Sequence, residues 1–188
     1  KLAERRLDET FLVISGDALC DVDLTSLVEA HKAKGAAVTI GLKSVDNPLE
    51  FGIVVTDEEG RIERFLEKPS WGQVFSDTIN TGIYVIEPEV MRHVPDGPYD
   101  FSKELFPLLL EMGRPMYGFV CDGYWQDIGN LDQYRQANFD ALDEKVRLNV
   151  PGIRLRGDVW IGEGVEIDDV EGVEGPAFVG DYCRIAPD

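Results

Sequence analysis

The sequence is poor in cysteine and in long apolar runs. Its three cysteines, Cys20, Cys121 and Cys183, are scattered, and no two of them have the CxxC spacing of a zinc or redox site. Because an odd and scattered set cannot build a disulfide framework, the pattern predicts reduced thiols in a cytoplasmic protein. No stretch approaches the roughly 20 apolar residues that span a bilayer. The first ten residues, KLAERRLDET, lack the apolar core of a signal peptide.

Positive charge is also scarce. The chain has 18 lysines and arginines against 36 aspartates and glutamates, which gives a formal net charge of −18. A field of this sign repels nucleic acid and anionic membranes, so neither is expected as a partner. A phosphate ligand needs a metal ion or a few local cations to overcome the same repulsion. Apolar residues make up 44% of the sequence, which is enough for a packed globular core.

The hydrophobic pattern predicts an α/β fold. The apolar run 11–14 stops at the turn residues 15–17, which is typical of a strand buried on both faces of a parallel sheet. Apolar residues at helical spacing predict a helix over 24–34, and the β-branched run 36–42 predicts a second parallel strand. These elements form a βαβ unit. His31, at the end of the helical stripe, is interpreted as a helix-face residue and not as a catalyst.

Further strands and helices are expected along the rest of the chain. Two strand-like runs flank the turn DEEG and predict a hairpin. A later helix contains a proline, Pro107, so we expect a kink or break there. The expected strands cover 51–56, 61–67, 79–86 and 115–120, and the expected helices cover 102–112 and 131–144.

Two aspartates that follow strands are candidate metal ligands. Asp17 comes directly after the first predicted strand, and Asp127 lies in the segment YWQDIGN after the last one. Ligands of open α/β sheets bind outside the carboxyl ends of the strands, and carboxylate oxygens suit Mg²⁺. We therefore predict that Asp17 and Asp127 meet at one edge of the sheet. The alternative for Asp17 alone is a turn former without function.

Residues suited to a phosphorylated sugar follow two other strands. Pro69 holds Lys68 in an extended conformation, so the ammonium group projects from a defined place. Asn80 offers a donor and an acceptor for a sugar hydroxyl, and Gly82 permits a ligand to approach the backbone. The alternatives are a solvated lysine at a strand end and a bulge at a strand entry.

From residue 148 the composition changes, because glycines become frequent and helical periodicity disappears. A period of three hexapeptides is typical of one coil of a left-handed parallel β-helix. We therefore expect an α/β domain over 1–146 and an incomplete β-helix segment over 147–188. The pattern of Ile161, Val165 and Ile167 recurs 18 residues later as Val179, Cys183 and Ile185.

Six stretches occur in an order that resembles the nucleotide-sugar pyrophosphorylases, which are sugar-1-phosphate nucleotidyltransferases. They are SGDALCDVDL, FGIVV, RIERFLEKP, INTGIYVIEP, DFSKELFP and YWQDIGN. The sequences FGIVV, RIERFLEKP and YWQDIGN most resemble those of mannose-1-phosphate guanylyltransferases. The resemblance implies a Rossmann-like fold of the GT-A type, with a mostly parallel mixed sheet, followed by the start of a left-handed parallel β-helix.

The resemblance also implies a role for each candidate residue. Asp17 and Asp127 would hold the Mg²⁺ ion, and Lys68 would bind the phosphate of the sugar 1-phosphate and take part in catalysis. The residues implied to contact the sugar or its phosphate are Gly52, Glu67, Asn80, Thr81 and Gly82. The hydroxyl groups of the sugar would donate hydrogen bonds to Glu67.

The implied reaction transfers a nucleotidyl group from a nucleoside triphosphate to a sugar 1-phosphate and releases pyrophosphate. GTP and mannose 1-phosphate, giving GDP-mannose, are the expected substrates. The alternatives are glucose-1-phosphate thymidylyl-, uridylyl- or adenylyltransferases and a non-catalytic subunit that senses a nucleotide-sugar. The family's glycine-rich loop, which carries an arginine and a lysine, does not occur in this sequence. We therefore expect a fragment that is inactive alone, with the β-helix as the candidate surface for a homo-oligomer.

Overall fold

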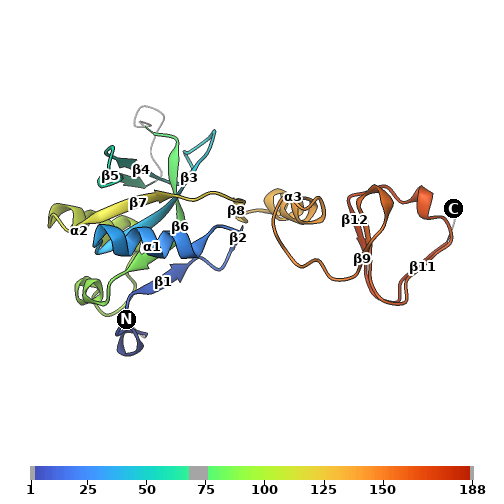
Figure 1. The fold of residues 1–188 in the computed structure, drawn as a ribbon, viewed down its shortest axis with the longest axis horizontal. Coiled ribbons are helices and arrows are strands. Elements are labelled where there is room, and N and C mark those ends of the chain that lie inside the picture. Colours follow the sequence, from blue (N-terminus) through green and yellow to red (C-terminus); the bar gives the residue numbers. More distant parts are fainter. Residues whose placement is uncertain (1–2, 68–75, 187–188) are drawn as a thin grey trace. The chain divides into compact units, whose positions relative to one another are not determined.

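The computed structural model describes residues 3–67 and 76–186 (Figure 1). Within this part of the chain, no helix combines the length and the apolar character that a membrane crossing requires. The chain divides into two compact units, and a short N-terminal segment belongs to the second of them. The first unit comprises 1–16 and 22–122, and the second comprises 17–21 and 123–188.

The first unit is built on a six-stranded sheet with the order β5-β4-β6-β3-β7, in which β1 also pairs with β6. In the described chain β3 and β7 are the parallel pair, and the other pairs of this sheet are antiparallel. The expectation of a mostly parallel sheet is therefore wrong, because apolar runs report burial and not strand direction. The strands are β1 (Phe11–Ile14), β3 (Val38–Ser44), β4 (Gly52–Thr56), β5 (Ile62–Glu67), β6 (Thr78–Ile86) and β7 (Met116–Val120).

The predicted strand–helix–strand unit is present, but its two strands are not neighbours. Strands β1 and β3 each pair antiparallel with β6, which lies between them. Helix α1 (Leu24–Lys34) connects them and has the expected ends, an Asp23 N-cap and Gly35 in the left-handed region. Strand β1 is not buried on both faces, since Leu12 is 39% and Ile14 is 46% exposed.

Helices cover both faces of the sheet. Ile40 of β3 packs in the core cluster that contains Phe106 of helix α2 (Phe106–Glu111). The neighbouring residue Thr39 is hydrogen-bonded through its hydroxyl to the imidazole of His31 in α1. Because neighbouring residues of a strand point to opposite faces, α1 and α2 lie on opposite sides of the sheet. The apolar core thus fills the α2 side of the sheet. A short 3₁₀ helix, Pro88–His93, follows β6.

The break expected at Pro107 is confirmed. A π-helical turn, Phe101–Leu105, precedes α2, and Asp100 caps it by accepting hydrogen bonds from the backbone N–H groups of Ser102 and Lys103. Proline has no N–H and its ring crowds the preceding turn, so a regular α-helix cannot run through position 107. The wider π turn accommodates the ring.

The second unit contains a two-stranded ribbon, a helix and short paired strands. In the ribbon, β2 (Ala18–Cys20) pairs antiparallel with β8 (Trp125–Asp127). Helix α3 (Leu131–Leu142) follows, and the Asn130 side chain caps it by accepting from the N–H of Gln133. The remaining strands are β9 (Ile153–Arg154), β10 (Val159–Ile161), β11 (Glu166–Ile167), β12 (Ala177–Val179) and β13 (Arg184–Ile185).

The C-terminal strands pair at an offset equal to the 18-residue repeat of the sequence. Strand β10 pairs in parallel with β12, and β11 pairs in parallel with β13. Both pairs are offset by 18 residues (159 to 177 and 167 to 185). The left-handed coil itself and the domain division at 146/147 stay predictions.

Candidate functional site

The ribbon of β2 and β8 brings the backbones of the two candidate metal ligands close together. Ala18 lies opposite Asp127 in the antiparallel register, and the N–H of Ile128 donates to the carbonyl of Asp17 at 3.2 Å. The backbones of Asp17 and Asp127 are therefore close, on diagonal positions of the ribbon, although the two residues are 110 positions apart in the sequence (17 to 127). Asp17 lies opposite Ile128, so the register by itself does not place the two carboxylates on one face. The ribbon is a separate two-stranded pair and not an edge of the main sheet. Their role as metal ligands stays a prediction.

The chemistry of this pair fits a magnesium ion that is shared with phosphates. Asp17 is exposed and Asp127 is half-buried, and both supply hard oxygen donors. Among residues 3–67 and 76–186, no group of three or more histidine, cysteine or acidic side chains gathers as a cage for a metal. Magnesium is usually held by one or two carboxylates, and water and substrate phosphates supply the other ligands. Two aspartates match the protein's part of such a site.

The Asn80 side chain is held by three hydrogen bonds in the first unit. Its amide nitrogen donates to the hydroxyl of Tyr84 at 3.0 Å and to that of Ser102 at 3.2 Å, and its oxygen accepts from the N–H of Gly82 at 3.0 Å. The side chain is half-buried, so it has a fixed orientation and a partly accessible surface. Its contact with a sugar stays a prediction.

Thr81 and Gly82 have clear roles inside the fold. Thr81 is 2% exposed, and its hydroxyl donates to the carbonyl of Gly41 at 2.7 Å. Gly82 has φ +76°, and a β-carbon there would lie 2.6 Å from Oγ of Ser15. The glycine is therefore required by a backbone conformation and by a close contact with Ser15. The sequence suggested ligand approach as the reason for this glycine, and the structure supplies a second reason.

The remaining predicted sugar-site residues lie at the open end of the β4–β5 hairpin. Gly52 begins β4 and lies opposite Glu67, the last residue of β5. The two are therefore neighbours in space, as a shared ligand contact requires. Lys68, the predicted phosphate ligand, lies outside the described residues.

A family model for nucleotidyl transferases matches residues 1–144. The chain belongs to the nucleotidyl transferase family. A UTP–glucose-1-phosphate uridylyltransferase from Synechocystis is 43% identical over 184 residues, which is 95% of this chain and 47% of that protein. A mannose-1-phosphate guanylyltransferase from Mycobacterium tuberculosis is 34% identical over 191 residues, 99% of this chain and 52% of that protein.

The family resemblance inferred from the sequence motifs is thus confirmed. A further relative, a mannose-1-phosphate guanyltransferase from Candida albicans, is 39% identical over 134 residues, which cover 69% of this chain and 36% of that protein. The chain spans about half the length of the curated relatives that match nearly all of it. Because these relatives carry different names for base and sugar, the family does not determine the specific substrates.

Solved structures show the same fold. A Bacillus anthracis protein assigned as a glucose-1-phosphate thymidylyltransferase superposes with a TM-score of 0.65 at 24% identity, covering 79% of this chain and 61% of that one. The HddC protein from Yersinia pseudotuberculosis gives a TM-score of 0.59 at 23% identity, covering 72% of this chain and 57% of that one. The nucleotidyl transferase chain therefore has an α/β fold with a mixed sheet.

A carboxylate that no sequence motif marked, Asp21, lies at the other end of the ribbon of this nucleotidyl transferase. One oxygen of Asp21 accepts from the N–H of Tyr124 at 2.6 Å, and the other accepts from the N–H of Arg147 at 2.8 Å and from its Nε at 3.2 Å. The backbone N–H of Arg147 is the main cause that lowers the pKa of Asp21, and burial opposes it. An aspartate beside a turn carries no sequence signal for this role.

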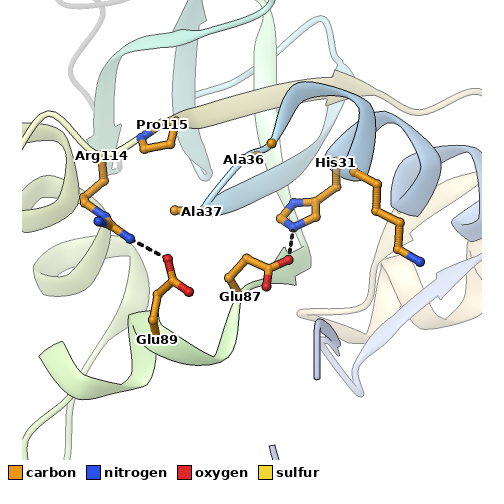
Figure 2. Close-up of a pocket in the computed structure, with 9 residues that line it drawn as sticks. His31, Ala36, Ala37, Glu87, Glu89, Arg114 and Pro115 are labelled. Carbon is orange, nitrogen blue, oxygen red and sulfur yellow. Dashed lines mark hydrogen bonds and ion pairs between the residues drawn. The ribbon is translucent and has the colours of Figure 1, made fainter. Parts of the chain in front are cut away.

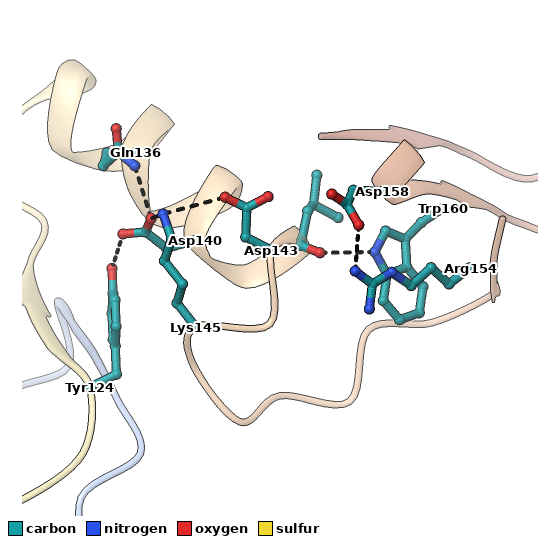
Figure 3. A network of polar contacts seen from close by, with 9 residues as sticks. Tyr124, Gln136, Asp140, Asp143, Lys145, Arg154, Asp158 and Trp160 are labelled. Atoms are coloured by element: carbon teal, nitrogen blue, oxygen red, sulfur yellow. Dashed lines mark hydrogen bonds and ion pairs between the residues drawn. The ribbon is translucent and has the colours of Figure 1, made fainter. Parts of the chain in front are cut away.

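A second polar network anchors α3 (Figure 3). The hydroxyl of Tyr124 donates to Asp140 at 2.8 Å, and Gln136 and Lys145 donate to the other oxygen of the same carboxylate at 2.9 Å and 2.7 Å. Burial raises the pKa of Asp140, but the hydrogen bonds from Lys145, Tyr124 and Gln136 outweigh it and the net shift is downward. Burial and the bond to Asp140 raise the pKa of Tyr124 far above its ordinary value.

The first unit also has a polar cavity of about 530 Å³. Figure 2 shows two acid–base pairs beside it, His31 with Glu87 at 3.0 Å and Arg114 with Glu89 at 2.7 Å. His31, predicted as a helix-face residue, is 1% exposed and bonds to Thr39 and Glu87. The hydroxyl of Thr10, which donates to Glu87 at 2.6 Å, is the main cause that lowers the pKa of Glu87. Of the predicted site residues that the structure describes, none lines this cavity.

Proposed function

We propose that residues 1–188 carry the metal and sugar-phosphate side of a sugar-1-phosphate nucleotidyltransferase. The observation that carries the proposal is the ribbon register, which brings the backbones of Asp17 and Asp127 close together in a member of this family. A structural turn residue at position 17 needs no acidic neighbour across a ribbon.

In the proposed reaction an oxygen of the sugar 1-phosphate attacks the α-phosphorus of a nucleoside triphosphate. The bond from that phosphorus to the bridging oxygen breaks, and the electron pair leaves with pyrophosphate. The protein needs no nucleophile of its own, so catalysis rests on positioning and charge neutralisation. Asp17 and Asp127 hold Mg²⁺ in this proposal, and the ion supplies neutralising charge for the phosphates.

The other predicted residues bind the sugar phosphate in this proposal. Lys68 neutralises the sugar phosphate, which reduces its repulsion from the incoming triphosphate and from a chain of net charge −18. Glu67 accepts hydrogen bonds from sugar hydroxyls, and Asn80 lines the sugar pocket in the orientation fixed by Tyr84 and Ser102. The residues proposed to complete the pocket are Gly52, Thr81 and Gly82.

Two substrate pairs have specific support. The resemblance of FGIVV, RIERFLEKP and YWQDIGN to mannose-1-phosphate guanylyltransferases supports GTP and mannose 1-phosphate as substrates. The 43% identity to a uridylyltransferase over 95% of this chain supports UTP with glucose 1-phosphate as the second candidate. The test measures pyrophosphate release from GTP, UTP, dTTP and ATP, each with mannose 1-phosphate and with glucose 1-phosphate. The pair with the highest kcat/KM identifies the substrates.

We also propose that 147–188 begin a left-handed β-helix that follows an α/β domain over 1–146. The support is the parallel pairing of β10 with β12 and of β11 with β13 at an offset of one 18-residue coil. Unpaired edges of stacked coils present backbone groups for further strands. Such an edge is the surface through which a homo-oligomer would form in this proposal.

The metal assignment is tested in the whole protein that contains residues 1–188. We expect Asp17→Asn and Asp127→Asn each to lower kcat by at least about 100-fold, the size of effect seen when charge stabilisation of a transition state is lost. Pyrophosphate release at several Mg²⁺ concentrations measures this. Asp46→Asn, which changes an exposed aspartate of the first unit, is the matched control and should leave kcat unchanged. Near-normal turnover of both ribbon variants would refute the assignment.

A further inference from the structure

The partners of the Asn80 side chain fix which end of its amide is the oxygen. One end of the amide faces the backbone N–H of Gly82 at 3.0 Å. Because a backbone N–H can only donate, the amide atom beside it must be the oxygen. The amide nitrogen then lies 3.0 Å from the hydroxyl of Tyr84 and 3.2 Å from that of Ser102. The orientation of the amide therefore follows from the chemistry of its neighbours.

These bonds use most of what the Asn80 amide can offer. An amide group has two N–H hydrogens to donate and two lone pairs on its oxygen. One hydrogen is donated to Tyr84 and the other to Ser102, and one lone pair accepts from Gly82. Within residues 3–67 and 76–186, no second donor bonds to this oxygen. Asn80 therefore has one acceptor position left for a ligand, and no donor.

A bulge in β6 brings Asn80 and Tyr84 within reach of each other. Strand β6 advances four positions from Asn80 to Tyr84, while the paired strand β3 advances two positions between Leu42 and Ile40. Gly82, with its φ of +76°, lies in the middle of this bulge. Four residues of β6 thus cover the length of two residues of β3, which shortens the path between the two side chains. Bulges are known to re-aim side chains in this way next to active sites.

The two hydroxyls that bind the amide nitrogen are themselves held in place. Tyr84 is 8% exposed, and its ring packs edge-on against Phe106 with the ring centroids 5.0 Å apart. Ser102 lies in the π-helical turn before α2, and its backbone N–H donates at 2.8 Å to the carboxylate that caps this turn. A reversed amide would set its NH₂ group against the N–H of Gly82, two donors face to face. The amide of Asn80 is therefore fixed in one orientation.

We propose that Asn80 recognises the sugar 1-phosphate only as a hydrogen-bond acceptor, and that Ser102 is a positioning residue that keeps it in this state. The sugar group at Asn80 is then a hydroxyl that donates its hydrogen. The inference rests on the proposed function, since it concerns the sugar pocket of the same site. It replaces the expectation from the sequence that Asn80 offers both a donor and an acceptor to the sugar.

Fluorine distinguishes a fixed acceptor from an amide that is free to turn. A fluorine substituent accepts weakly and cannot donate, and a hydrogen substituent does neither. A fixed acceptor therefore loses the same bond with either substituent. An amide that can turn its NH₂ group toward the sugar would bind the fluoro sugar better than the deoxy sugar, because it could donate to fluorine.

The test uses the whole protein that contains residues 1–188 and measures kcat/KM for pyrophosphate release. The substrates are mannose 1-phosphate, glucose 1-phosphate and their analogues with one hydroxyl replaced by hydrogen or by fluorine. A double-mutant cycle of Asn80→Ala with each deoxy analogue identifies the hydroxyl at Asn80, because its removal costs nothing further once the amide is gone. At this position we expect the deoxy and fluoro analogues to lower the wild-type kcat/KM equally, by about tenfold or more.

Ser102→Ala removes one partner of the amide and keeps Asn80. We expect the KM for the sugar 1-phosphate to rise by about 3- to 10-fold, while kcat and the KM for the triphosphate change by less than about twofold. Ser102→Thr keeps the hydroxyl and should restore the KM. A residue that only stabilised the unit would lower the urea midpoint without this split between the two KM values. Thr25→Ala, which removes a hydroxyl from an exposed position of α1, is the matched control and should leave all three constants unchanged.

The outcomes separate this inference from the proposed function. Absence of turnover with every triphosphate and both sugar 1-phosphates overturns the proposed function. Turnover in which the fluoro analogue at the Asn80 position is used clearly better than the deoxy analogue overturns the acceptor-only role and leaves the function standing. An unchanged sugar KM in Ser102→Ala overturns the positioning role. If Asn80→Ala does not fold, Ser102→Ala takes its place in the cycle, and additive costs at every hydroxyl overturn the inference.

Discussion

Gly82 illustrates how one position can satisfy the fold before it meets any ligand. Its φ of +76° lies in the left-handed region, and Ser15 occupies the space where a β-carbon would stand. The N–H of Ser15 donates to the carbonyl of Gly82 at 3.0 Å, so the end of β1 is fixed against β6 at this point. The glycine therefore couples the segment before Asp17 to the strand that carries Asn80.

We expect Gly82→Ala to lower the free energy of unfolding by about 2–5 kcal/mol. Of this, about 1–2 kcal/mol comes from the left-handed backbone of an L-residue, and overpacking against Ser15 adds about 1–3 kcal/mol. Urea denaturation followed by circular dichroism measures the change. Gly97→Ala is the matched control, because Gly97 also has a positive φ, +104°, but has no atom within 4 Å of its β-carbon position. An equal effect of the two substitutions would show that the Ser15 contact carries no cost.

Among the elements, α3 shows how a polar network replaces an apolar stripe. In this helix Ala137 and Asp140 are the buried residues, whereas the aromatic side chain of Tyr134 is 58% exposed. The buried carboxylate accepts from Tyr124, Gln136 and Lys145, so its charge is compensated. The helix is thereby held to the end of the chain segment that leads into β8.

Removal of one donor from this network should destabilise the second unit. We expect Tyr124→Phe to lower the free energy of unfolding by about 1.5–3 kcal/mol, because a hydrogen bond to a buried charge is lost. Tyr134→Phe, at an exposed position of α3, should stay within about 0.5 kcal/mol, as substitutions at exposed positions usually do. Urea denaturation monitored by tryptophan fluorescence compares the two variants. Equal stabilities would contradict a contribution of the Tyr124 bond.

At the scale of the whole molecule, carboxylates with lowered pKa values make the free energy of unfolding depend on pH. The pKa of Asp140 lies below its ordinary 3.8 and that of Glu87 below its ordinary 4.5. A group whose folded pKa is depressed contributes stability above its unfolded pKa and loses that contribution as pH falls through the folded value. Both units therefore contain carboxylates that favour the folded state at neutral pH and not in acid.

We expect the stability difference between the wild type and Glu87→Gln to be largest at pH 7 and to shrink as pH falls below about 4.5. Thr10 donates to the charged carboxylate, which is the main reason that the folded state favours ionisation. Urea midpoints at pH 7, 5, 4 and 3 measure the difference. Comparison of two variants at each pH cancels the general effect of neutralising a chain of net charge −18. A difference that is constant with pH would contradict the prediction.

Sequence alone determined the local elements and the family. The hairpin of β4 and β5, the break at Pro107 and the 18-residue register were all predicted, because each depends on nearby residues or on a repeated spacing. The two aspartates were named from motifs that lie in the expected order, and the resemblance to nucleotidyl transferases was confirmed. Local patterns of this kind record which residues are buried and where the backbone turns.

Tertiary structure alone decided how those elements pair. The apolar runs of β1 and β6 do not reveal that β6 lies between β1 and β3 and runs against both, since burial is the same for either direction. The contact of Asp21 with Arg147 joins residues 126 positions apart, and no local pattern marks such a pair. Long-range partners depend on where the whole chain brings each segment, and that information is not contained in the spacing of neighbouring residues.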